Sequence, residues 1–134
     1  MSLFTVPLAE AVIAALKAKP ICAGRVHSFV PKKETKPYVL VTDFNGRYDH
    51  AQGVYVVNEQ FSIKIFDDAE TLKKGMEIRQ EITEILTDEA FEVAGAGLVL
   101  MSVISEIAGF DHDGDGSETF ARFNALLHKE LDNG

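Results

Sequence analysis

The chain has 134 residues, and the 46% of them that are hydrophobic exclude an intrinsically disordered protein. This length suits one domain with its own core, so we expect a single domain over residues 1–134. The formal net charge of −8 argues against nonspecific binding to a nucleic-acid backbone, which depends on an excess of Lys and Arg.

The first predicted element is an amphipathic helix that ends at Pro20. Thr5 is expected to cap its N-terminus, with Pro7 tolerated in the first turn. The apolar stripe of this helix consists of Leu8, Val12 and Leu16. Residues 25–29 then indicate a short edge strand, and the lysine-rich run after Pro31 indicates a solvated loop.

A long β-hairpin is predicted next. β-Branched and aromatic residues predict strands over residues 38–44 and 54–66, joined by a turn over residues 45–53 that begins with Asn-Gly. In the second strand, apolar and polar residues alternate, so one face is expected to meet the core and the other to meet water.

The alternation changes parity in the first half of that second strand. Val54 and Val56 fall on the polar parity, and Glu59 falls on the apolar one. This half of the strand is therefore expected either to carry a bulge or to project beyond the core, where it could supply a contact with another subunit.

A second helix is predicted over residues 67–86. Asp67 followed by Glu70 resembles a capping box. The apolar stripe, which is expected to lie on the sheet, consists of Leu72, Met76, Ile78, Ile82, Ile85 and Leu86. Arg79 interrupts this stripe, and we expect its side chain to snorkel or to pair with a sheet carboxylate such as that of Glu59.

Two further strands are predicted to close the domain. Residues 98–108 form the first, with Val99, Met101, Val103 and Ile107 on one side, and residues 119–128 form the second after a turn. The order of helix, strands, helix and strands contains no repeated βαβ unit. It therefore predicts the α+β class, as an antiparallel β-sheet with two α-helices packed on one face.

The turn over residues 111–116 contains the clearest local motif. Asp111, Asp113 and Asp115 alternate before a glycine, as carboxylates do in a calcium-binding EF-hand loop. The twelfth position of such a loop is occupied by Arg122 instead of a bidentate Glu, and the flanking segments alternate like strands. We therefore interpret the motif as a solvated hairpin turn, with weak Ca²⁺ binding by the three aspartates as the alternative.

No grouping of residues predicts catalysis. The four histidines are scattered, and the single cysteine, Cys22, has only Arg25 as a basic neighbour in the sequence. We expect a protein that is not an enzyme and that needs no cofactor or metal.

The tip of the predicted hairpin is the candidate contact site. A turn over residues 45–53 is longer than the two to five residues that a hairpin usually needs. Arg and Tyr are enriched in protein interfaces, and both occur in it. The predicted interface residues are Arg47, Tyr48, Asp49, His50, Val54 and Val56.

An ordered set of segments runs through most of the chain, from about Leu8 to Leu127. These segments are Ala11-Val12-Ile13-Ala14-Ala15-Leu16, Gly24-Arg25-Val26-His27, Pro31, Pro37-Tyr38-Val39-Leu40-Val41 and Gln60-Phe61-Ser62-Ile63-Lys64-Ile65-Phe66. Together they resemble the tail completion family of long-tailed bacteriophages and prophages.

The resemblance implies a small α+β subunit, similar to tail terminator proteins, that closes into a six-membered ring on the finished tail tube. Its implied partners are copies of itself, the tail tube protein and the head–tail connector, with no specific nucleic acid and no membrane. Its implied location is the virion, after assembly in the bacterial cytoplasm. The alternatives are another neck component, such as a head-closure protein, and a calcium-binding interaction module built on residues 111–116.

Overall fold

The computed structural model describes residues 2–28, 34–51, 54–68, 72–110 and 116–130. The helices are α1 (Thr5–Lys17), the 3₁₀ turn η1 (Ile21–Gly24) and α2 (Lys73–Leu86). The strands are β1 (Val26–His27), β2 (Tyr38–Ala51), β3 (Val54–Asp67), β4 (Leu98–Phe110) and β5 (Ser117–Glu130).

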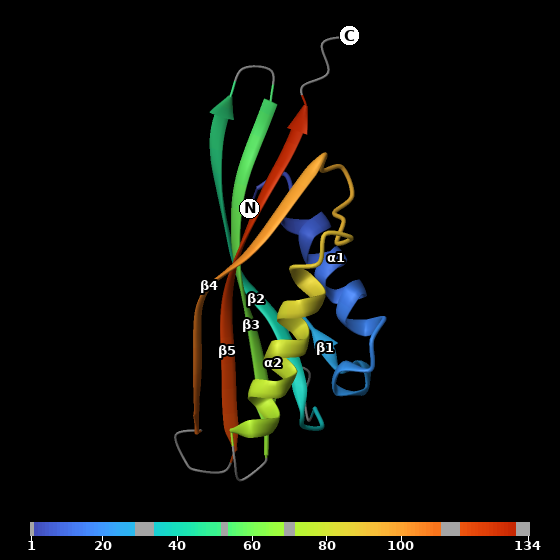
Figure 1. Cartoon of the computed structure of the whole chain (residues 1–134), viewed down its shortest axis with the longest axis vertical. Helices are drawn as coiled ribbons and strands as arrows, with labels where there is room; N and C mark the ends of the chain where they lie inside the picture. Colours follow the sequence, from blue (N-terminus) through green and yellow to red (C-terminus); the bar gives the residue numbers. More distant parts are fainter. Residues whose placement is uncertain (1, 29–33, 52–53, 69–71, 111–115, 131–134) are drawn as a thin grey trace.

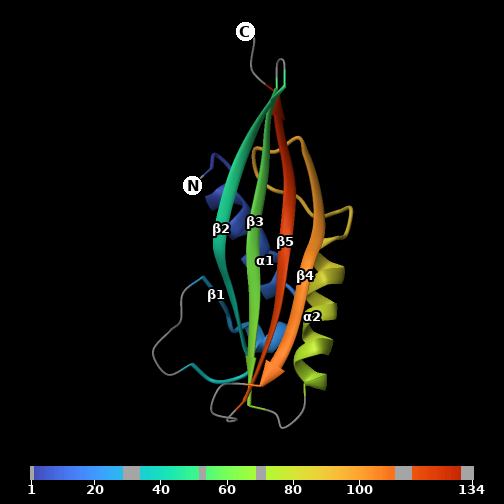
Figure 2. The same ribbon diagram turned by 90° about the vertical axis from the view of Figure 1, so that its left-hand side faces the viewer.

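The described strands form one sheet in the order β1-β2-β3-β5-β4. All neighbouring pairs are antiparallel except β1 and β2, which are parallel. Helices α1 and α2 lie against the same face of this sheet, and the opposite face carries no helix in the described part of the chain (Figures 1 and 2). The predicted α+β class, with two helices on one face, is therefore confirmed. Neither of these helices is long and apolar enough to cross a membrane.

The core lies between the helices and the sheet. The Phe61 ring stacks between Phe44 and Phe123, with ring centroids 5.4 and 5.5 Å apart. The predicted stripe of α1 is fully buried, as are Ile82 and Leu86 of α2. The α1 pattern thus identified the face that packs on the sheet. The α2 pattern did so in part, because Met76 of the predicted stripe is exposed.

The predicted turn over residues 45–53 is wrong, because β2 continues to Ala51. Residues 45–51 pair one by one with residues 60–54 of β3. A bulge lies between Thr42 and Asn45, where Asp43 has a φ of +57°. The Asn-Gly pair is a local turn signal, and here the ladder with a long neighbouring strand overrides it.

The parity change in β3 reflects a buried carboxyl group. β3 pairs with β5 from Val54 to Asp67 without a shift in register, so of the two expected alternatives the bulge in β3 is wrong. Val57, Glu59 and Phe61 all lie on the helix-covered face and are fully buried. Glu59 thus occupies a core position, whereas Val56, an odd number of residues away, lies on the uncovered face.

Both predicted helix starts are wrong. Helix α1 is preceded by Phe4 at the N-cap position, without a side-chain cap, and Thr5 is already helical. Helix α2 begins at Lys73, while Asp67 ends β3 opposite Ser117. Glu70, the other member of the expected capping box, is outside the described residues.

A second bulge changes the faces of β4. The register with β5 shifts between Val103 and Ser105, so Ile104 is an extra residue in this strand. Val99, Met101 and Val103 pack against the core as predicted. Ile107 does not, because the extra residue moves it to the uncovered face, where 63% of the residue is exposed.

Candidate functional site

The sheet ends in two open edges on opposite sides. β1 covers β2 only at Val39 and Leu40, so residues 45–51 of β2 pair on one side only, with β3. Leu98–Phe110 of β4 pairs on one side only, with β5. We call residues 45–51 the β2 edge and Leu98–Phe110 the β4 edge. Among the described residues, no strand pairs with the outer side of either edge. Apart from the Ile107 carbonyl oxygen, which accepts a hydrogen bond from Arg79, the outward-pointing backbone groups are therefore available for hydrogen bonds to another strand.

The two edges lie at the same height in the sheet. The ladders place Arg47, Asn58, Leu126 and Leu100 in one row across β2, β3, β5 and β4. Two rows further along the strands, Asn45 and Ser102 occupy the ends of another row. The β2 edge is therefore level with the first half of the β4 edge.

The β4 edge exposes large apolar side chains. They are Leu100, Ile104, Ile107 and Phe110, and Met76 of the neighbouring helix α2 is exposed beside them. Edge strands are usually protected by Lys, Pro, bulges or inward-pointing charges. β4 contains neither Lys nor Pro, and its bulge at Ile104 and its one charged residue, Glu106, both lie in its second half. The first half, residues 98–103, has none of these protections, which favours a strand that becomes covered by a partner.

A second group of exposed apolar side chains accompanies the β2 edge. It consists of Leu3, Val6 and Tyr48. The backbone N–H of Leu3 donates a hydrogen bond of 2.6 Å to the Tyr48 hydroxyl oxygen, which fixes the N-terminal segment next to this edge (Figure 2). The β2 edge and the β4 edge are thus accompanied by two different groups of exposed apolar side chains.

The predicted interface residues do not form one surface. Tyr48 pairs with Val57 on the helix-covered face, whereas Arg47 and Asp49 lie on the uncovered face, the latter opposite Val56. The backbones of His50 and Val54 lie in the same ladder, opposite Tyr55 and Ala51, and their side chains are outside the described part.

On the uncovered face, the β2 edge borders a polar groove of about 460 Å³ lined by Asn45, Arg47, Asp49, Asn58, Gln60 and Asn124. The Asn58 amide donates a hydrogen bond of 2.9 Å to the Asp49 carboxylate, and the Asn124 amide donates one of 3.3 Å to the Asn58 carbonyl oxygen. These side chains satisfy one another and give this face a polar character.

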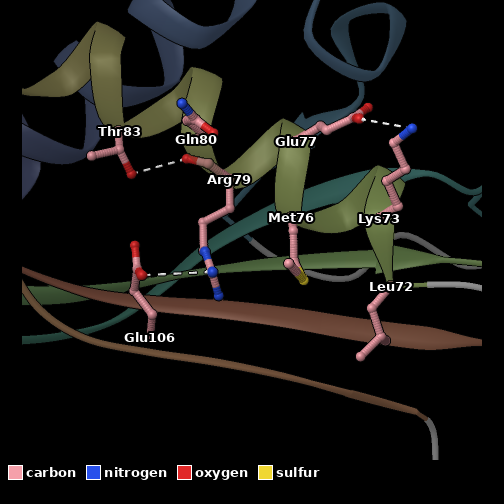
Figure 3. A pocket seen from close by; sticks show the side chains of 8 residues that line it. All are labelled: Leu72, Lys73, Met76, Glu77, Arg79, Gln80, Thr83 and Glu106. Atoms are coloured by element: carbon pink, nitrogen blue, oxygen red, sulfur yellow. Dashed lines mark hydrogen bonds and ion pairs between the residues drawn. The ribbon is translucent and has the colours of Figure 1, made fainter.

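Arg79 joins α2 to the second half of the β4 edge (Figure 3). Its guanidinium lies 3.6 Å from the Glu106 carboxylate and donates a hydrogen bond of 3.3 Å to the carbonyl oxygen of Ile107. The expected pairing with a sheet carboxylate is confirmed, but the partner Glu59 was wrong. The pair borders an open groove of about 630 Å³ between α2 and β4, in which Leu72 and Met76 supply apolar surface.

Glu59 instead anchors the start of the chain. One carboxyl oxygen accepts a hydrogen bond of 2.8 Å from the Thr5 hydroxyl and a short one from the Ser2 hydroxyl. The other oxygen has no partner among the described residues. The only sequence signal of this contact was a Glu at a position where the alternation of β3 predicts an apolar, core-facing residue. The spacing of residues could not show that Thr5 and Ser2 bind Glu59.

Substituting Thr5 with Val is expected to lower the free energy of unfolding by about 0.5–1.5 kcal/mol, because Glu59 loses one buried donor while the shape of the side chain is kept. Urea denaturation followed by circular dichroism measures this change. Thr5→Ser keeps the hydroxyl and is expected to lose less; equal losses in the two variants would contradict the role of the hydrogen bond.

Among the described residues, no three His, Cys, Asp or Glu side chains are placed to hold a metal ion. The turn with Asp111, Asp113 and Asp115 is outside the described residues, so its alternative as a calcium site stays a prediction. Cys22 is buried, and burial raises the pKa of its thiol, although the nearby Arg25 acts in the opposite direction. The thiol is therefore held in its protonated, weakly nucleophilic form.

Comparison with known proteins identifies the family. No curated protein matches the chain. Among solved structures, a chain of the virion of the native gene transfer agent (GTA) particle has a TM-score of 0.84 at 16% identity, covering 96% of this chain and 99% of its own length. That likeness concerns the fold. The model of the family described as tail completion protein gp17 matches residues 10–128, and the chain therefore belongs to this family of phage tail structural proteins.

Proposed function

We propose that the chain is a tail terminator subunit, copies of which close into a ring on the finished tail tube. The observation that carries this proposal is the pair of open and unlike edges on opposite sides of one sheet, each accompanied by exposed apolar side chains. A head-to-tail ring needs two different surfaces on each subunit, whereas a two-fold dimer uses one surface twice. Membership of a tail completion family supports the same role, with six copies as the resemblance implies.

The other partners would bind the two faces of such a ring. When the ring axis runs along the strands, the ring faces are formed by the ends of β2, β3 and β5. The tail tube protein would lie against one face and the head–tail connector against the other. The subunit would reach this place from the bacterial cytoplasm during assembly of the virion.

Deletion of the gene from its phage or prophage is expected to give overlong tails, because nothing then stops polymerisation of the tube. Electron microscopy of the particles measures tail length, and supplying the intact gene from a plasmid is the control that should restore normal tails. Tails of normal length that are detached from filled heads would contradict termination and would favour a head-closure component of the neck.

A further inference from the structure

We propose that the β2 edge of one copy pairs with the β4 edge of the next, so that the sheets of neighbouring subunits join into one. This inference rests on the ring proposed above and names the strands that make its subunit interface. The occupant of each edge is thus a second copy of this chain.

The strand directions fit such a joint. The ladders fix the direction of each strand: β2 runs opposite to β3, β3 opposite to β5, and β5 opposite to β4. β2 and β4 therefore run in opposite directions within one copy. A rotation about an axis parallel to the strands keeps strand directions, so β4 meets the β2 of its neighbour as an antiparallel partner.

The heights of the edges fit it as well. The same rotation leaves each residue at its own height, so the row that contains Arg47 in one copy continues into Leu100 of the next. Both positions belong to the uncovered face, where the aliphatic stem of Arg47 can cover the exposed Leu100. On the helix-covered face, Tyr48 then faces Val99, the residue beside Leu100.

On the β2 side of the sheet, the outermost strand changes from β2 to β1 at the level where the second half of β4 begins. Below the bulge of β2, the outermost strand is β1, which pairs with Val39 and Leu40. At this height β4 exposes Ile107 and Phe110, next to the groove that Arg79 and Glu106 border. The first half of the β4 edge would therefore bind β2 by backbone hydrogen bonds. The second half would cover its apolar side chains with the β1 side of the neighbour.

Cysteine pairs test both the joint and its faces. The double variant Arg47→Cys/Leu100→Cys places two thiols opposite each other across the proposed joint, at a separation that a disulfide spans with small adjustments. Asn45→Cys/Leu100→Cys and Asp49→Cys/Leu100→Cys sample register steps of two residues, which keep the same face. Both positions of each pair lie at exposed strand edges, and the natural Cys22 is buried, so it is expected to stay unreacted.

The measurement is mild oxidation of particles assembled with each variant, followed by electrophoresis without reductant. We expect at least one same-face pair to give a ladder of covalent oligomers larger than dimers, which reductant collapses to the monomer. Tyr48→Cys/Leu100→Cys is the matched control; its two thiols point to opposite faces of the joined sheet and should give at least tenfold less product.

Two outcomes would overturn the inference. Dimers formed by Leu100→Cys alone would mean that β4 pairs with its own copy across a two-fold axis. Tails of normal length without a ladder from any same-face pair would refute the β2–β4 joint while leaving tail completion intact. A refutation of the proposed terminator function is measured separately, by the tail length in the deletion strain.

Discussion

Replacing Phe61 with Ala is expected to lower the free energy of unfolding by about 3–5 kcal/mol, the largest effect of any single substitution considered. Phe61 is fully buried at the middle of β3, and its ring stacks on those of Phe44 and Phe123. Truncation removes the Phe61 ring, and with it both stacking contacts, and leaves a cavity between the sheet and the helices. Equilibrium denaturation in urea measures the loss.

Phe66→Ala is the matched control on the same strand. Phe66 is only partly buried, and its ring stacks on Tyr38 with the centroids 5.0 Å apart. Its truncation is expected to cost less than half as much, because less apolar area returns to water and no enclosed cavity forms. Comparable losses for the two variants would mean that the core is not centred on the Phe61 stack.

The sequence predicted elements whose signal is repeated over several turns or rows. The stripe of α1 and the buried part of the α2 stripe, at Ile82 and Leu86, were recognised from spacing alone. Features that depend on one residue or one neighbour were missed. The Asn-Gly pair at residues 45–46 is a turn signal in isolation, and only the long ladder with β3 shows that it lies within a strand. The bulge at Ile104 reverses the faces of β4 and has no local signature of its own.

The candidate site was predictable only in part. The hairpin tip is predicted to be a contact region from its Arg and Tyr residues and from a turn length that the structure contradicts. Residues 45–51 of this tip form the β2 edge. The β4 edge could not be identified because the order of strands is not written in the sequence. β5 inserts between β3 and β4, and this places β4 at the outside. Leu100 and Ile104, which are apolar on the parity opposite to the predicted core side, were the available signal.

The seating of α2 on the sheet supplies the second large prediction. Gly75 is buried in α2, and a Cβ atom at this position would lie 2.3 Å from the Thr119 hydroxyl oxygen on β5. Alanine is the better helix former by about 1 kcal/mol, but the overlap must push the helix away from the sheet. Gly75→Ala is therefore expected to lower the free energy of unfolding by about 1–3 kcal/mol, as measured by urea denaturation.

Thr119 decides whether this overlap is the cause. Its hydroxyl has no hydrogen-bond partner among the described residues, so Thr119→Ala by itself should lose little polar interaction. In the double variant Gly75→Ala/Thr119→Ala the closest clashing atom is gone, and much of the lost stability is expected to return. Gly109→Ala, where no atom lies within 4 Å of the added Cβ, is the neutral control. Additive losses in the double variant would show that Gly75 is required for a reason other than close packing of α2 on β5. The close packing of α2 on β5 also places Arg79 within reach of the β4 edge.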